Sequence, residues 1–573
     1  MESTPVQHVL DQAYDYVIVG AGTSGCVIAS RLSEDPGTTV LLLEAGGDDL
    51  EWEEIAIPGS SGLMQCSKYD WSFRGVSQES AFKGFENQAS TIPRGKVLGG
   101  SSAINYNMHM RGTPHDYDIW KNMGCTGWGY ADVLPYFIKS ETCLVSDLLD
   151  GGFRGTSGPV IVTEARFSPI GDIFVDGGKE MGYRKTDCNG PDPIGFMVAQ
   201  SNIGDGIRQS SSEVYLRKAA TRPNLHIATY GHVTKILIHN NIARGVEFIR
   251  GNKQSSVRAK REVILCAGTI CTPQILMLSG IGHRYHLQSH KIDVIADLPV
   301  GDNLQDHNTF FGLEFEIDKP YAAMMSSPES KDLYDRLRIG PIATNILEAT
   351  ALVRSDLQEP GNPNPDLHLV LISGMLGAVE NSSFQRNTAM KGEFWDAMFA
   401  GNVGKHGFNI NPSVTHPRSR GNIRLQSADP FQHPLIDHQT LTHEQDIKTL
   451  IEGVKFILSL TDTKPFRSVG ARWTGRVLPG YQKTPFTDEY WEEVIRTLTH
   501  YTYHPAGTCK MGRPDDPTAV VDPKLRVKGV DKLRVADASI MPEITSANLN
   551  APCVMIGEKA ADLIRGRTIS PKL

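Results

Sequence analysis

The sequence lacks any long hydrophobic run: no stretch of about 18 consecutive apolar residues, the length a membrane-spanning helix needs, occurs among its 573 residues. It also lacks a block rich in lysine and arginine, and its formal net charge is -8. A chain of this sign repels an anionic polymer on average, which argues against a nucleic-acid partner. With 40% hydrophobic and 21% charged residues, the composition is typical of a soluble globular protein, and no membrane span is expected.

The nine cysteines form no CxxC pair and show no histidine/cysteine spacing of the kind that binds zinc, so no metal site is predicted. Their number is odd, and several lie in glycine-rich or apolar segments. This pattern indicates buried free thiols rather than a disulfide framework, which mildly favours a reducing compartment.

Three weak signals leave the compartment open. The first residues, MESTPVQHVLDQAYDY, contain no apolar signal-peptide core, so the protein is cytoplasmic or peroxisomal, or it is secreted and a leader was removed. Asn381-Ser382-Ser383 is a glycosylation sequon, which favours secretion, whereas Pro571-Lys572-Leu573 is a weak variant of a peroxisomal signal. The sequence fixes neither the localisation nor the oligomeric state.

Residues 16–43 have the pattern of a strand, a glycine-rich turn, a helix and a second strand. The apolar run from Tyr16 to Val19 leads into Gly20-Ala21-Gly22-Thr23-Ser24-Gly25, and another apolar run covers residues 39–43. In such a turn the first glycine permits a tight bend, the second lets backbone amides approach a pyrophosphate, and the third allows close packing of helix on strand. The unit therefore predicts a dinucleotide whose pyrophosphate lies at the helix N-terminus.

An acidic residue follows the second strand. Glu44, with Ala45 behind it, comes about 20 residues after the turn, where a carboxylate can accept both ribose hydroxyls and would repel a 2'-phosphate. FAD or NAD is therefore expected, and the motif alone does not choose between them. The alternative interpretation of Glu44 is a solvated carboxylate at a strand end.

Two further segments combine glycines with apolar residues. In PRGKVLGGSSAINYNMHMRG, residues 93–112, the paired glycines bring backbone amides close to an anion or a ring. We interpret it as a second clamp on a large cofactor, with a flexible surface loop as the alternative. Residues 261–282, REVILCAGTICTPQILMLSGIG, predict a buried strand, a turn at Ala267-Gly268 and a short helix that begins at Pro273. This unit is expected to join the sheet of the first one.

The sequence resembles the glucose-methanol-choline (GMC) oxidoreductase family from about Tyr14 to Arg565. The resemblance is carried by GKVLGGSSAIN (95–105), GTICTPQILMLSGIG (268–282) and the amino-terminal fingerprint. Within the family, WGYADVLPYFIKSE is similar to the animal glucose-dehydrogenase-like and choline-dehydrogenase-like branch. The resemblance implies an α/β FAD-binding Rossmann-like domain and an α+β substrate domain with a mostly antiparallel sheet.

The resemblance also implies which residues bind FAD. The ADP half is assigned to Gly20, Gly22, Thr23, Ser24, Gly25, Glu44 and Ala45, with Val233 on the adenine side. The flavin is expected to be lined by Arg94, Val97, Gly100, Asn105, Asn107, Met108 and His109. Asp537 is placed by the pyrophosphate and ribityl chain, and Asn548 by the ring. Covalent attachment of FAD through His109 stays open.

His504, in HYTYHPAGTCKMG, is the predicted catalytic base. The family pairs the histidine of an HPxGT stretch with an asparagine before a late Ala-Pro step, here Asn550. A neutral imidazole suits removal of the hydroxyl proton, the hydride would go to flavin N5, and Asn550 would hydrogen-bond the developing alkoxide. Tyr503 forms an aromatic wall over the substrate or is ordinary core packing. His416, also followed by proline, is the competing candidate.

The chain is longer than one hydrophobic core usually supports, which predicts two large intertwined domains. Residues 315–475 lose the strand-helix rhythm and contain stretches typical of a mixed or antiparallel sheet, such as PDLHLVLISGM. We therefore assign residues 1–165, 209–314 and 485–573 to a discontinuous FAD-binding domain, and residues 166–208 and 315–484 to a substrate-binding domain.

The predicted function is FAD-dependent oxidation of a small-molecule alcohol, with the electrons passed to O2 or another acceptor. The family commonly reads Gly-Asn-Thr-Asn where this chain has Ala547-Asn548-Leu549-Asn550, which leaves substrate choice open. A hydroxynitrile-lyase-like enzyme would use His504 as a base without net redox chemistry. A fatty-acid photodecarboxylase-like photoenzyme is disfavoured, because that branch lacks the histidine of HPAGT and carries a cysteine where residues 409–421 have none.

Overall fold

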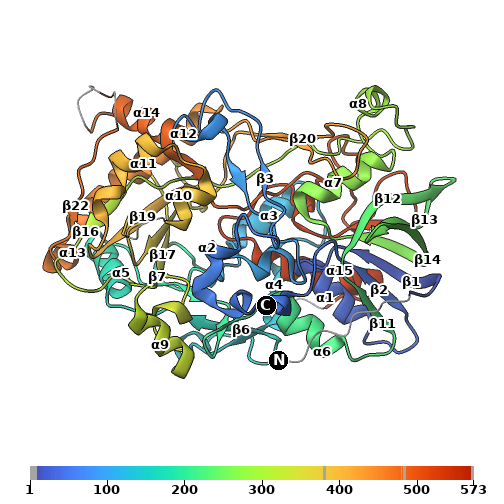
Figure 1. The fold of residues 1–573 in the computed structure, drawn as a ribbon, viewed down its shortest axis with the longest axis horizontal. Coiled ribbons are helices and arrows are strands. Elements are labelled where there is room, and N and C mark those ends of the chain that lie inside the picture. The colour runs from blue at the N-terminus through green and yellow to red at the C-terminus, as the bar shows by residue number, and fades with distance from the viewer. Residues whose placement is uncertain (1–9, 379–381, 479–480, 482–485, 570–573) are drawn as a thin grey trace.

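Two large sheets, each assembled from strands far apart in the sequence, form the framework of the protein (Figure 1). The computed structural model describes residues 10–378, 382–478, 481 and 486–569. The sequon residue Asn381 and the segment Pro571-Lys572-Leu573 lie outside these residues. The two sheets occupy opposite sides of the molecule in Figure 1, and the segments between them carry most of the candidate site residues.

The first sheet contains the strands of the glycine fingerprint. Its parallel strands lie in the order β11 (Leu225–Ala228), β2 (Val40–Leu43), β1 (Ala13–Val19), β14 (Lys253–Leu265) and β24 (Leu533–Val535). The first half of β14 instead pairs antiparallel with β13 (Ile242–Arg250), which pairs with β12 (Gly231–His239). Every residue of β2 and the last three of β14 are buried, as expected for strands covered on both faces.

The helix that follows the fingerprint turn packs against a helix from the far end of the chain. They are α1 (Thr23–Leu32) and α15 (Asn550–Ile564) (Figure 1). Ser24 Oγ donates to the carbonyl oxygen of Cys553 at 2.8 Å, and a Cβ on Gly557 would lie 2.8 Å from Val27, so a glycine permits the close approach. The buried carboxylate of Glu558 accepts from Arg31 at 2.7 Å. The cofactor unit is therefore closed by residues from both ends of the described chain.

The second sheet is antiparallel. Its strands lie in the order β22 (Arg472–Trp473), β16 (Glu314–Glu316), β19 (Gly407–Val414), β18 (Leu367–Ile372), β17 (Leu347–Val353) and β7 (Gly195–Val198). β15 (Asn308–Phe310) pairs with β19 and with β23 (Thr499–Tyr501). One hydrophobic core joins this sheet to helices α5 (Ile170–Glu180), α12 (Glu444–Thr461) and α14 (Asp488–Leu498). A parallel nucleotide sheet plus a mostly antiparallel second sheet confirms the predicted fold class.

The sheets divide the chain at slightly different places from the predicted boundaries. Residues 308–310 and 488–501, assigned from sequence to the FAD-binding domain, belong to the antiparallel sheet and its core. The reason is packing: α14 buries Tyr490, Trp491 and Val494 against that core, and β23 follows the helix directly. His504 therefore follows a strand of the antiparallel sheet closely.

Helix α7 (Gly268–Leu278) begins five residues before the predicted start at Pro273, which lies inside the helix. An internal proline leaves the carbonyl four residues earlier without its helical donor. Here that carbonyl, on Thr269, accepts from the Thr508 hydroxyl at 2.6 Å, which compensates for the loss.

The other described helices and strands are short connections around this framework. They are α2 (Ser61–Met64), α3 (Pro114–Asn122), α4 (Tyr130–Ser140), α6 (Arg217–Ala219), α8 (Arg284–Ser289), α9 (Pro328–Leu337), α10 (Ser383–Thr388), α11 (Gly392–Met398), α13 (Lys464–Ser468), β3 (Phe73–Arg74), β4 (Thr91–Ile92), β5 (Glu141–Cys143), β6 (Val160–Glu164), β8 (Gln200–Ser201), β9 (Ile203–Gly204), β10 (Ile207–Arg208), β20 (Asn422–Arg424) and β21 (Leu435–Asp437). Within the described residues, no helix has the length and apolarity to cross a membrane. The same residues contain no group of three or more histidine, cysteine or acidic side chains placed to hold a metal ion.

Candidate active site

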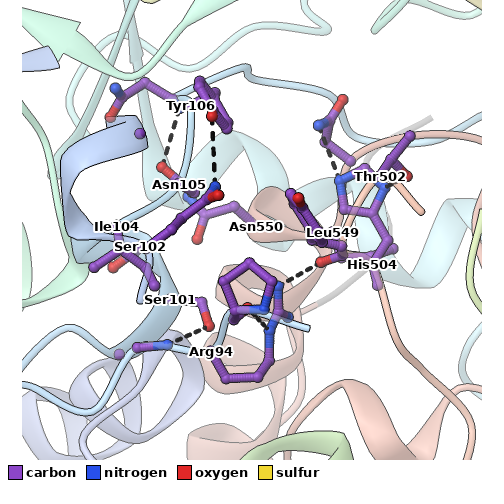
Figure 2. A pocket seen from close by; sticks show the side chains of 18 of the residues that line it. Arg94, Ser101, Ser102, Ile104, Asn105, Tyr106, Thr502, His504, Leu549 and Asn550 are labelled. Atoms are coloured by element: carbon purple, nitrogen blue, oxygen red, sulfur yellow. Dashed lines mark hydrogen bonds between the residues drawn. The ribbon is translucent and has the colours of Figure 1, made fainter. Parts of the chain in front are cut away.

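A cavity of about 850 Å³ lies between the two sheets and collects most of the predicted site residues (Figure 2). The predicted residues that line it are Gly20, Gly22, Thr23, Ser24, Glu44, Ala45, Arg94, Gly100, Asn105, Asn107, Met108, Val233, Tyr503, His504, Asp537, Asn548 and Asn550. Figure 2 shows Thr502 and His504 on one side of the cavity and Asn105 and Tyr106 on the other. Segments separated by hundreds of residues thus share one space.

Three predicted cofactor residues do not line the cavity. Gly25 is a packing residue, because a Cβ there would lie 2.0 Å from the carbonyl oxygen of Gly20. Val97 is fully buried in a small cluster with Ile104. His109 follows Met108 in extended backbone, so the two side chains point to opposite sides; Met108 lines the cavity, and His109 Nε2 lies 3.3 Å from Glu141. Attachment of a cofactor through His109 has no support from this position.

The glycines at the start of α1 leave backbone groups accessible. A Cβ on Gly22 would meet only the carbonyl oxygen of Cys266, at 3.9 Å, so open space lies above the helix N-terminus. Gly100 has φ +54 and approaches so closely that a Cβ there would lie 2.6 Å from the Cα of Gly22. Two glycine-rich segments therefore form one cradle; the Gly100 N–H donates to the carbonyl oxygen of Val97, so the N–H groups in the first turn of α1 are the ones that suit an anion.

Glu44 closes the cradle from the end of β2. Its carboxylate accepts from the backbone N–H of Ala21 at 2.8 Å and of Gly46 at 2.9 Å. A carboxylate has about four lone-pair positions, so two remain for ligand hydroxyls. Burial raises the pKa of Glu44 to about 7, and the two N–H groups oppose this rise.

His504 lies just beyond β23, where the backbone directs it into the cavity. Tyr503 has φ 64, a left-handed conformation that is strained for a non-glycine residue, and Pro505 disfavours helical backbone at His504. The His504 backbone N–H donates to Asp306 Oδ1 at 2.8 Å, and the Arg94 guanidinium donates to the carbonyl oxygen of Tyr503 at 2.6 Å. The loop that presents the imidazole is thus held from both sides.

A second histidine fixes the tautomer of His504. His307 Nε2 lies 2.9 Å from the carbonyl oxygen of Thr545, so this nitrogen carries the proton. Its Nδ1 is then an acceptor, and it lies 2.9 Å from His504 Nδ1, which must donate. Thr502 Oγ1 shares that proton at 2.7 Å. His504 Nε2 is therefore the unprotonated nitrogen, the one that carries the lone pair.

The asparagine that contacts His504 is Asn548 and not Asn550. Asn548 Nδ2 donates to His504 Nε2 at 3.0 Å, whereas Asn550 Oδ1 accepts from the Thr23 hydroxyl at 2.9 Å. The predicted pairing of His504 with Asn550 is wrong because α15 begins at Asn550, which directs that side chain toward α1. Asn548, in the turn before the helix, reaches the imidazole instead (Figure 2 shows Asn550 on its helix).

His504 is neutral in this setting. Burial lowers its pKa well below the ordinary 6.5, and the positive charge of Arg94 lowers it further. His416, the competing candidate, does not line the cavity; its Nε2 lies 3.0 Å from Asp116 Oδ1. Of the two candidate histidines, only His504 lines the cavity.

Comparisons with known proteins agree with this architecture. Two family models, both described as GMC oxidoreductase, match residues 14–309 and 417–557. The chain belongs to the GMC oxidoreductase family. It is 39% identical over 562 residues to glucose dehydrogenase (FAD, quinone) of Drosophila melanogaster, covering 97% of this chain and 87% of the relative. It is 37% identical over 564 residues to oxygen-dependent choline dehydrogenase of Sinorhizobium medicae, covering 96% of each.

A solved structure extends the agreement to the fold. A variant of Aspergillus oryzae formate oxidase superposes with a TM-score of 0.85 at 27% identity, covering 97% of this chain and 99% of that protein. The resemblance predicted from the sequence is confirmed. As a GMC oxidoreductase, the protein is an FAD-dependent enzyme that acts on CH–OH donors.

The residues present fit FAD. The N–H groups at the start of α1 lie beside Gly22 and Gly100, where no Cβ atom stands in the way, which suits the pyrophosphate. Glu44 retains acceptor positions for ribose hydroxyls. Asp537 Oδ2 accepts from the Gly268 N–H at 2.9 Å at the start of α7, which places a second carboxylate on the cavity wall. We propose these residues as the FAD-binding set of this GMC oxidoreductase.

Replacing Glu44 with glutamine is expected to weaken FAD binding at least about tenfold. Both carboxylate oxygens accept backbone N–H groups, so the amide nitrogen of glutamine would face a donor, at a cost of about 1–3 kcal/mol. Fluorescence titration of the apoprotein with FAD measures the effect. Glu164→Gln, outside the cavity, is the control; an unchanged FAD affinity in Glu44→Gln would contradict the assignment.

Sequence reasoning did not find His307, Thr502 or the role of Asn548. His307 lies 197 residues from His504, and the two meet only because β15 pairs with β23. No local pattern marks that pairing. The available signal is weak: an Asp-His step directly precedes a strand of the substrate sheet.

Proposed function

We propose that this GMC oxidoreductase oxidises an uncharged alcohol, with His504 Nε2 accepting the hydroxyl proton. The observation that carries the proposal is the tautomer: His307 fixes the proton on His504 Nδ1, so Nε2 holds a lone pair inside the cavity. Bound FAD supplies the acceptor for the hydride of the carbinol carbon. The chain's own residues therefore have to bind the alcohol, orient it and hold its proton.

Asn548 is suited to the oxygen that loses the proton. Its amide donates directly to His504 Nε2 at 3.0 Å, so a substrate hydroxyl would displace this hydrogen bond, donating to the imidazole and accepting from the amide. As the proton leaves, that hydrogen bond becomes charge-assisted, which stabilises the alkoxide. The buried setting disfavours the resulting imidazolium, so the proton is held only while the substrate is changing charge.

The test is the visible spectrum of the holoenzyme during anaerobic addition of a panel of alcohols, followed by air. Loss of the flavin band at roughly 450 nm supports alcohol oxidation. Rapid return of colour in air identifies oxygen as the acceptor, and slow return that a quinone accelerates identifies a quinone. If no alcohol bleaches the flavin, the proposal fails, and release of cyanide from a hydroxynitrile becomes the next assay.

We expect the neutral carbon isostere of choline, in which carbon replaces the ammonium nitrogen, to show kcat/KM at least about tenfold above that of choline. The described residues that line the cavity include only two carboxylates, Glu44 and Asp537, both on the cofactor side, whereas Arg386 adds a positive charge. Burying an unpaired cation costs several kcal/mol. Aromatic lining residues such as Tyr106 and Phe311 offset about 2 kcal/mol of this.

Glu380 lies outside the described residues and is the control position for this comparison. If choline is the better substrate and Glu380→Gln removes that advantage, a carboxylate at 380 binds the cation and the expectation is wrong. If the neutral isostere is preferred in both proteins, the apolar lining decides the specificity.

A further inference from the structure

Two polar side chains on the cavity face of the antiparallel sheet take no part in the chemistry described above. They are His368 on β18 and Asn411 on β19, and both line the cavity. The register pairs His368 with Ser413 and Val370 with Asn411, so these side chains share one face of two neighbouring strands. His368 is 3% exposed and Asn411 is 4% exposed, so any partner has to come from within the cavity.

The hydrogen bonds of His368 fix its proton. The Thr350 hydroxyl donates to the carbonyl oxygen of Leu369 at 2.9 Å, so it accepts from His368 Nε2 at 2.7 Å. Burial lowers the pKa of His368 to about 4, which keeps the ring neutral. Nδ1 therefore carries a lone pair, and no group in the described part of the chain donates to it.

Asn411 presents the complementary group. Its amide oxygen is buried and has no hydrogen-bond partner among the described residues. Since that oxygen is sealed inside the sheet and the residue lines the cavity, the amide nitrogen is the group left for a ligand. One strand thus offers an acceptor and its neighbour a donor, which is the combination that a hydroxyl group satisfies.

A structural role does not account for this pair. The neighbouring cavity wall is apolar, with Val370, Ile372 and Met375 around it. A polar group left without a partner in such surroundings costs about 1–3 kcal/mol. His368 and His504 both line this one cavity, so a single ligand can contact both.

We propose that His368 Nδ1 and Asn411 Nδ2 bind a second hydroxyl group of the substrate, one that donates to the histidine and accepts from the asparagine. The substrate is then a largely apolar alcohol with one further hydroxyl at a fixed distance from the reacting carbon. This inference rests on the proposed alcohol oxidation and adds the substrate class. A simple alcohol lacks the second hydroxyl, and a sugar carries further hydroxyls that would face the apolar wall. Neither is therefore the expected substrate.

Redox-inert ligands test the site without turnover. A tertiary carbinol has no hydrogen to transfer, so diols of two tertiary carbinols, joined directly or through one or two methylene groups, bind without being oxidised. Each is compared, by calorimetry on the holoenzyme, with the analogue in which one hydroxyl is replaced by hydrogen. We expect the diol of matching spacing to bind about tenfold more tightly than its analogue, the effect of roughly one additional pair of buried hydrogen bonds.

Single substitutions test whether His368 and Asn411 cause the preference for the diol. His368→Leu and Asn411→Leu are each expected to remove the preference for the diol, and melting temperature and FAD content show whether each variant is folded. If His368→Leu does not fold, Asn411→Leu decides. Ser413→Ala, on the same face, should keep the preference because the Ser413 hydroxyl is sealed from the cavity. A preference that survives both leucine variants overturns the assignment.

The two proposals fail separately. If primary alcohols bleach the flavin but no diol binds better than its analogue, the hydroxyl site is wrong and alcohol oxidation stands. If a diol binds preferentially but no alcohol bleaches the flavin, the redox proposal is wrong and the binding site stands.

Discussion

Replacing His504 with alanine is expected to lower kcat/KM for alcohol oxidation by about 100- to 10,000-fold, the range that a positioned general base contributes. The loss should appear in the rate of flavin reduction measured by stopped flow, because the imidazole acts on the hydroxyl proton in that step. FAD content should stay the same, since the cradle of Gly22, Gly100 and Glu44 lies on other segments.

The matched control is His416→Gln, which changes the other histidine that precedes a proline. That residue lies outside the cavity, with its Nε2 3.0 Å from Asp116 Oδ1, so kcat/KM should stay within about threefold of the native value. This change is far below the loss of about 100-fold or more expected for a general base. If His504→Ala retains activity, or if His416→Gln loses as much, the assignment of the base is wrong.

The pH profile gives an independent check on His504. The base works when neutral, and its pKa is lowered well below 6.5 by burial. Activity should therefore be lost only as the pH falls through that lowered pKa, and the rate of flavin reduction should be flat from pH 6.5 upward. A rate that rises tenfold per unit between about pH 6.5 and 8 would indicate a base of raised pKa, and a rate that has already fallen to about half at pH 6.5 would indicate one of ordinary pKa; either result would contradict the structure.

Replacing each of two glycines of the fingerprint with alanine should have different effects, one on stability and the other on FAD binding. A Cβ on Gly25 would lie 2.0 Å from the carbonyl oxygen of Gly20, so α1 must shift away from β1, with a loss of about 1–3 kcal/mol of stability or more. A Cβ on Gly22 meets no chain atom closer than 3.9 Å and adopts a backbone that alanine tolerates. This Cβ would instead occupy the space above the N-terminus of α1.

Gly25→Ala should therefore lower the melting temperature of the apoprotein and abolish FAD loading. Gly22→Ala should leave the apoprotein melting temperature nearly unchanged and weaken FAD binding at least about tenfold. Calorimetric melting of apoprotein and FAD titration of each variant separate the two outcomes. Equal destabilisation of both apoproteins would mean that both positions are packing residues and that Gly22 does not border the cofactor.

What the sequence predicts well is what depends on local geometry. The turn at Gly20, the helix after it and the acidic end of β2 follow from spacing within about 30 residues, the length of a strand-helix-strand unit. Residues 315–475 predicted a mixed or antiparallel sheet because they lose the strand-helix rhythm, and the family resemblance implied that this sheet is mostly antiparallel. The family resemblance further identified the residues of the FAD-binding set, and most of them line the cavity.

The sequence does not predict features that depend on contacts between distant segments or on the position of a helix start to within one or two residues. Asn548 and Asn550 differ in role because a helix starts between them, and helix starts are uncertain by that much. His109 follows a residue that lines the cavity, but extended backbone turns it to the opposite side. The pairing of His307 with His504 depends on a strand alignment that neither segment encodes alone.

The meeting of α1 with α15, and of β14 with β24, has a consequence for biosynthesis. The site needs the fingerprint at residues 20–25, the central strand β14 and the late segment 533–564 at the same time. A growing polypeptide on the ribosome cannot complete the site until that late segment has emerged from the exit tunnel. FAD is therefore expected to bind only after nearly the whole chain has been synthesised.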